Sequence, residues 1–91
     1  MEQVFRYHVR NDSQNSIVVI LEPWAEELDL LPGKTLQISA YHSRDGILET
    51  IQTDQCFIVW LWGGCRATVS IDDQDCTPAT LRLAFPNWPD P

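Results

Sequence analysis

The chain has 91 residues, of which 44% are hydrophobic, and 13 acidic residues against six basic ones give it a net charge of −7. This length accommodates one domain with a single core, and the composition is typical of a globular protein rather than of a disordered one. The acidic balance argues against nucleic acid and anionic membranes as partners, because both require Lys and Arg to meet phosphates.

The start of the chain and its cysteines bear on its compartment. No basic-then-apolar leader opens the sequence, and no apolar run approaches the ~18 residues of a membrane span, so we expect a cytoplasmic protein. Cys56, Cys65 and Cys76 cannot all pair within one chain and show no Cys-x-x-Cys spacing. We therefore expect no metal site and no cofactor, while the redox state of each cysteine stays open.

Alternation of apolar and polar residues predicts the first two strands. VFRYHVR (4–10) places Phe5, Tyr7 and Val9 on one face and its basic residues on the other. The polar stretch NDSQNS (11–16) then turns the chain into IVVIL (17–21). Because this second strand is apolar on both faces, we expect it to be central in its sheet.

The segment EPWAEELDLLPG (22–33) admits two interpretations. Pro23 and the acids behind it fit the start of a short helix, which Pro32-Gly33 would end. Leu28, Leu30 and the Pro-Gly pair also suit a short strand that enters a type II turn. We favour irregular chain followed by a short edge strand.

A first hairpin is predicted after KTLQISAY (34–41), because Asp45-Gly46 is a strong two-residue turn signal. This hairpin would pair His42 with Glu49 and bring Arg44 to the same end. A carboxylate beside an imidazole can orient it as a general base, so His42, Glu49 and Arg44 are the candidate catalytic residues. The alternative, which we favour, is a solvated ion pair, since no Ser or Cys nucleophile lies beside them.

A second hairpin is predicted in CFIVWLWGGC (56–65) and the strand that follows. A turn at Gly63-Gly64 would pair Trp60 with Ala67 and Ile58 with Val69, and would gather one wholly apolar face, which we assign to the core. The opposite face of the first strand carries Phe57, Val59 and Leu61. If that face points outward, these three residues need a cover, which is either internal (the tail with Trp88 or the segment 22–33) or another subunit. In the second case they form an interface.

The remaining segments complete an all-β pattern. We expect a polar loop over 72–78, a last strand TLRLAF (80–85) and a Pro-rich tail over 86–91. Asp72, Asp73 and Asp75 lack the spacing of a calcium-binding loop, so no calcium site is expected. The sequence therefore predicts a single all-β domain over residues 1–91, a small β-sandwich or partly open barrel of about seven mainly antiparallel strands.

The tryptophans offer a possible ligand site. Trp60 and Trp62 lie on the face assigned to the core, and core packing is the interpretation that we favour for them. The alternative is an aromatic platform at the end of the sheet for a sugar or an aromatic ligand, in which Trp62, next to the turn, and Trp24 would take part. Four acids, Glu22, Glu26, Glu27 and Asp29, flank Trp24 and would suit a basic protein partner.

Two resemblances accompany these motifs. Glu22-Pro23-Trp24, Glu26-Glu27 and Leu31-Pro32-Gly33, followed by an alternating strand, resemble a box found in small uncharacterised bacterial β-proteins, which implies no known activity. The Pro-Gly turn that feeds a strand is also similar to cupin barrels. Cupins follow that turn with a His-x-His-and-Glu metal motif, whereas the strand here, TLQISAYH, has one His, so the similarity does not extend to cupin metal chemistry.

These observations predict a non-catalytic binding or protein-interaction domain whose partner is a second copy of the chain or a basic protein. The alternative is a small-ligand or carbohydrate pocket that uses Trp24 or Trp62. An enzyme that uses His42 and Glu49 is the least favoured hypothesis.

Overall fold

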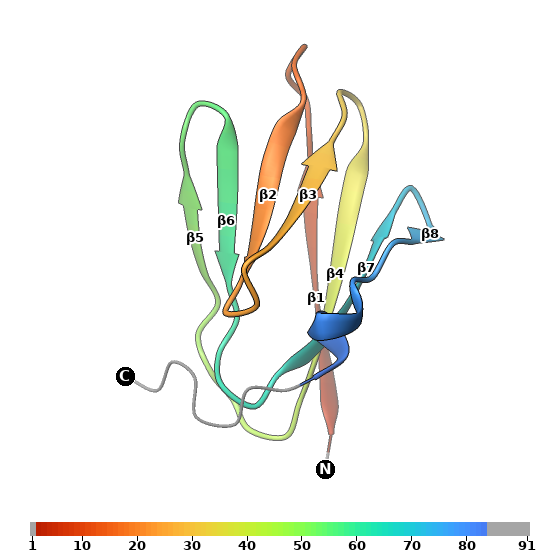
Figure 1. Ribbon diagram of the computed structural model, residues 1–91. Coiled ribbons are helices and arrows are strands. Elements are labelled where there is room, and N and C mark those ends of the chain that lie inside the picture. The colour runs from red at the N-terminus through yellow and green to blue at the C-terminus, as the bar shows by residue number, and fades with distance from the viewer. Residues whose placement is uncertain (1, 84–91) are drawn as a thin grey trace.

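The computed structural model describes residues 2–83 and shows two four-stranded β-sheets packed face to face (Figure 1). The elements are β1 (Gln3–Arg10), β2 (Ile17–Glu22), β3 (Glu26–Leu30), β4 (Thr35–His42), β5 (Glu49–Gln52), β6 (Cys56–Trp60), β7 (Arg66–Ile71), β8 (Gln74–Asp75) and the 3₁₀ helix η1 (Ala79–Arg82). The first sheet has the order β1-β4-β7-β8 and the second has the order β3-β2-β6-β5. All ladders are antiparallel except β2–β6, which is parallel. The all-β prediction is confirmed.

The core lies between the sheets and is built by the alternation of each strand. β4 buries Leu36, Ile38 and Ala40, as the sequence pattern predicts, and β7 buries Ala67 and Val69 from the same sheet. The second sheet contributes Val19, Leu21, Leu30, Val59 and Leu61, all at most 2% exposed. η1 packs against β7 and buries Leu81, which closes one side of the sandwich.

The predicted short edge strand after residue 22 is confirmed as β3, and no helix forms in this segment. The turn that follows has the features of a type II turn: the Lys34 N–H donates to the Leu31 carbonyl at 3.1 Å, and Gly33 adopts a φ of 79°. IVVIL is also central, as expected, because β2 lies between β3 and β6.

Both predicted hairpins are wrong. β4 and β5 belong to different sheets, and so do β6 and β7, so each connection is a corner that carries the chain across the sandwich. The backbone gives the reason, because a two-residue hairpin turn of type I′ or II′ requires a positive φ at its first central residue. Neither Asp45 nor Gly63 has a positive φ. In the second turn the positive φ of 88° lies at Gly64, the second central residue, which is the pattern of a type II turn and directs the two strands apart.

The turn with type I′ geometry lies elsewhere. Asp72 and Asp73 have φ values of 47° and 69° and connect Ile71 to Gln74 in the β7–β8 hairpin, inside the stretch predicted to be a loop. The last predicted strand is also wrong over residues 80–82, which lie in η1. Residues 84–85 of that strand and the tail lie outside the described residues.

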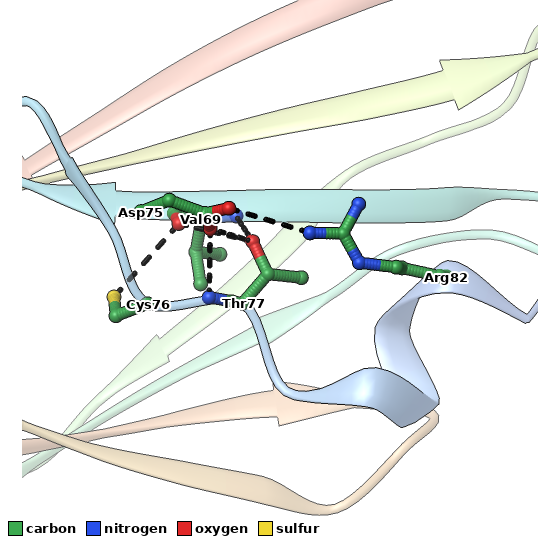
Figure 2. A network of polar contacts seen from close by, with 5 residues as sticks. All are labelled: Val69, Asp75, Cys76, Thr77 and Arg82. Atoms are coloured by element: carbon green, nitrogen blue, oxygen red, sulfur yellow. Dashed lines mark hydrogen bonds and ion pairs between the residues drawn. The ribbon is translucent and has the colours of Figure 1, made fainter.

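Backbone and side chain both extend the pairing of β7 beyond the end of β8. The Cys76 N–H donates to the Val69 carbonyl at 3.0 Å, and Thr77 Oγ1 accepts the Val69 N–H at 2.9 Å. The one hydroxyl proton of Thr77 has two acceptors in reach, Asp75 Oδ1 at 2.5 Å and the Val69 carbonyl at 3.1 Å (Figure 2). Asp75 in turn accepts a hydrogen bond from the N–H of Thr77 and forms an ion pair with Arg82. This network fastens the chain before η1 to the edge of β7.

Candidate functional site

The predicted catalytic group is not assembled. β4 carries His42 and β5 carries Glu49, and the ladder places Glu49 beside Trp60 instead. His42 is 7% exposed, and its Nδ1–H donates to the Arg44 carbonyl at 3.0 Å. Because the hairpin that would join them does not form, His42 has a structural role at a corner and no orienting carboxylate reaches it through the predicted pairing.

Trp62 is the centre of that corner. Its Nε1–H donates to the same Arg44 carbonyl at 3.0 Å, and its ring meets His42 edge-on with centroids 5.0 Å apart. Gly46 lies so close that an added Cβ would be 2.0 Å from the indole Cγ. The loop after β4 therefore covers the indole, which leaves the predicted ligand platform at Trp62 largely occupied by the protein itself.

Trp24 is likewise used internally. It is 8% exposed, belongs to the core, and donates its Nε1–H to the Leu83 carbonyl at 2.9 Å. The premise of an exposed indole for a ligand or a basic partner is therefore wrong at this position. Of the four flanking acids, Glu26 hydrogen-bonds to Thr80, and the others lie on the outer side of the second sheet.

The aspartates of the 72–75 segment also have internal partners. The Thr35 N–H and the Lys34 ammonium, both 3.1 Å from Asp72, lower the pKa of its carboxyl group. The hydroxyl and N–H of Thr77 lower the pKa of Asp75 (Figure 2). Among the described residues, no group of three or more His, Cys, Asp or Glu side chains could hold a metal ion.

The three cysteines are free thiols. Cys65 lies in the core, and burial raises its pKa to about 11. Burial, and then the charge of Asp75, raise the pKa of Cys76. Neither thiol is activated as a nucleophile, because activation requires a lowered pKa.

The orientation of β6 reverses the predicted interface. Val59 and Leu61 are 0% and 2% exposed and face the core together with the partly buried Phe57. The predicted exposed stripe is therefore wrong, and the core assignment of Ile58 and Trp60 is wrong with it. These side chains project from the opposite side of β6, the outer side of the second sheet.

That outer side forms a continuous apolar surface. The parallel ladder places Val18 beside Cys56 and Ile20 beside Ile58, and the β5–β6 ladder places Ile51 beside Ile58. We call this surface the apolar face: it comprises Val18, Ile20, Ile51, Cys56, Ile58 and Trp60. Ile51 is 50% exposed and the other five are partly buried, since neighbours on a sheet shield one another. Within residues 2–83 no helix lies over it, because η1 packs against β7 (Figure 1).

Acidic side chains surround the apolar face. Glu22 and Glu49 flank Trp60 on its two neighbouring strands, while Glu27 lies beside Ile20 and Asp29 beside Val18. No Lys or Arg occurs in β2, β3, β5 or β6. None of these four carboxylates makes a hydrogen bond or ion pair with another residue in the described range 2–83.

The outer side of the first sheet has a different character, and we call it the polar face. It carries Arg6, His8, Gln37, Tyr41, Arg66, Thr68 and Ser70. Part of its charge is paired within the chain, since Arg66 pairs with Glu2 at 2.6 Å and stacks over Tyr41 at 4.6 Å. His8 hydrogen-bonds to Gln37 at 3.0 Å.

A cavity of about 340 Å³ lies at the end of the sandwich where the β1–β2 loop meets the β5–β6 turn. Several of its polar side chains already have partners within the chain. Buried Asn11 donates to the carbonyls of Asn15 and Leu30, each at 2.8 Å, and Arg10 pairs with Asp12 at 2.6 Å. The cavity contains none of the predicted ligand-binding tryptophans and offers a ligand no unpaired buried group, since every buried side-chain N or O among the described residues has a partner.

Sequence reasoning missed the apolar face because β6 is apolar on both sides. The signal available in the sequence is that two strongly apolar strands, IVVILE and CFIVW, contain no Lys or Arg, and that the first of them ends in an acid.

Comparisons with models of protein families, with curated proteins and with solved structures found no match. No helix within residues 2–83 is long and apolar enough to cross a membrane.

Proposed function

We propose that the protein is a non-catalytic interaction domain that binds a protein partner through the apolar face. The observation that carries this proposal is the side-by-side placement of Ile20, Ile58 and Ile51 on the outer side of a sheet. A contiguous apolar surface rimmed by polar residues is typical of a docking surface in soluble proteins. Trp60 at its margin supports the same interpretation, because tryptophan is enriched among the residues that dominate binding energy at interfaces.

The catalytic alternative has weaker support. His42 is buried and bonded to backbone, and no described Ser, Thr or Cys side chain hydrogen-bonds to its imidazole. The ligand-pocket alternative would require accessible indoles, whereas Trp24 and Trp62 both donate to backbone carbonyls.

The proposal is tested by photo-crosslinking in the cells that make the protein. A benzoylphenylalanine is placed at position 58 or 20 of the apolar face, and at position 68 of the polar face as a matched control. We expect positions 58 and 20 to give an adduct with the same protein and position 68 to give none. The crosslinked protein is then identified by mass spectrometry, purified and titrated against the wild-type chain.

The titration also includes Ile58→Lys, which places a charge in the middle of the apolar face without touching the core. We expect this variant to keep the wild-type unfolding midpoint and to lose binding by about tenfold or more. No discrete adduct at positions 58 and 20, or equal binding by Ile58→Lys, would refute the proposed function.

A further inference from the structure

The apolar face differs from an ordinary interface in the sign of its rim. Glu22, Glu27 and Glu49, with Asp29, surround it, and its four strands carry no Lys or Arg. Rims of protein interfaces are usually polar, and complementary charge across them sets the choice of partner. A rim of one sign therefore restricts which surfaces can dock there.

The rim carboxylates also form no ion pair within the described chain. Between described residues, the acids that form ion pairs all lie outside this rim: Asp12 with Arg10, Glu2 with Arg66, Asp72 with Lys34 and Asp75 with Arg82. The rim acids have no such partner among residues 2–83. Cations from outside can thus approach them without breaking an existing ion pair.

A second copy of the chain fits this rim poorly. In a symmetric dimer the same patch meets itself, so the acids around one apolar face would confront the acids around the other. Like charges juxtaposed at an interface are strongly unfavourable, and neither copy supplies a cation from these strands.

We infer that the occupant of the apolar face is a different protein, whose contact surface has an apolar centre surrounded by Lys or Arg side chains. This inference rests on the proposed function and names the chemistry of the partner. Apolar contact with Ile20, Ile58 and Trp60 supplies the binding energy, while the rim acids select a cationic surface and speed its association.

The test uses the full chain and two synthetic peptides, one of alternating leucine and lysine and one of alternating leucine and glutamate. Binding is followed by NMR through the methyl signals of Ile20 and Ile58 and the indole signal of Trp60. We expect the lysine peptide to shift these signals and the glutamate peptide not to do so. Affinity for the lysine peptide should fall between about 0.1 M and about 1 M salt, as the Debye length shortens from about 10 Å to about 3 Å.

A pair of charge-matched variants locates the effect. Glu22→Gln with Glu49→Gln removes two negative charges from the rim, and Thr68→Lys with Ser70→Lys adds two positive charges to the polar face. Both change the net charge equally, but only the first should weaken lysine-peptide binding, by about threefold or more.

Three results would overturn the inference. The lysine peptide could leave the signals of the apolar face unchanged, the two peptides could bind equally well, or sedimentation could show a dimer that Ile58→Lys dissociates, which would identify a second copy as the occupant. Equal binding of the peptides refutes only the charge of the partner. Failure of the proposed function is recognised separately, by the absence of an adduct at positions 58 and 20.

Discussion

Arg66 and Glu49 lie on opposite outer faces of the same sandwich and are used in different ways. Arg66, on the polar face, is held by Glu2 and by the ring of Tyr41. Glu49, beside Trp60 at the edge of the apolar face, has no side-chain partner among residues 2–83. A net charge of −7 conceals this division, because the sheet order collects β2, β3 and β5, with their acids, in one layer and the arginines of β1 and β7 in the other.

The two faces differ in the partners of their charged groups. Arg66 on the polar face pairs within the chain, whereas the four carboxylates around the apolar face have no side-chain partner among residues 2–83. Substitutions on the two sides of β6 can test whether the residues of the apolar face lie outside the core.

The largest expected effect comes from comparing the truncation of an inward side chain, just after β6, with that of an outward side chain within β6. Leu61→Ala should lower the free energy of unfolding by about 2–5 kcal/mol, because it opens a cavity at a position that is 2% exposed. Ile58→Ala, on the apolar face, should cost about 1 kcal/mol or less. Urea denaturation of both variants measures the difference. A larger loss for Ile58→Ala would mean that β6 faces the other way.

The second test concerns the corner that carries the chain from one sheet to the other. Gly46→Ala places a Cβ 2.0 Å from the Cγ of Trp62, so the loop or the indole must move. We expect a loss of about 1–3 kcal/mol in unfolding free energy, the usual cost of overpacking.

The control for this corner is Asp45→Ala, an exposed neighbour in the same loop, which should change stability by about 0.5 kcal/mol or less. Thermal unfolding followed by tryptophan fluorescence compares the two variants. Equal stability of both would show that the loop does not rest on Trp62, and the crossover between the faces would need another explanation.

The smallest expected effect is on the pH dependence of stability, and it distinguishes an acid that is paired within the chain from one that is not. Thr35 and Lys34 hold the pKa of Asp72 below its usual value of 3.8. A carboxyl group whose pKa is lowered by folding stabilises the folded state above its unfolded pKa, and this contribution is lost as the pH falls through the folded pKa. Asp72→Asn should therefore be less stable than wild type at pH 7, and the gap should narrow below about pH 4.

Asp29→Asn supplies the matching change beside the apolar face. Asp29 makes no side-chain hydrogen bond or ion pair within the described residues, so this variant should stay close to wild type in urea midpoint at both pH values. A pH-dependent loss as large as that of Asp72→Asn would contradict the division of the acids into paired and unpaired groups.

The strands of this fold could be predicted from the sequence, but their partners could not. Alternation in VFRYHVR and TLQISAYH locates β1 and β4 and their inner faces, because one side of each is polar. The dipeptides Asp45-Gly46 and Gly63-Gly64 suggest hairpins, yet a dipeptide permits a positive φ without requiring it. Asp72-Asp73, a weaker signal, adopts the hairpin geometry.

The candidate site was missed for a related reason. CFIVW is apolar on both sides, so its inner face can be assigned only from its neighbours. Pairing it with β7 makes Ile58 and Trp60 appear to be core, whereas its true neighbours β2 and β5 place them outside. A parallel partner some 38 residues away in the ladder, Ile20 to Ile58, leaves no local trace in the sequence.

The end of β8 also bears on how the edge of the first sheet meets other chains. An exposed strand edge is a template on which another chain can polymerise, and natural sheets blunt such edges with short strands or coverings. β8 is only two residues long, and immediately beyond it the Cys76 N–H and the Thr77 hydroxyl occupy the backbone groups of Val69. At this point of β7 an incoming strand therefore finds no free backbone group with which to pair.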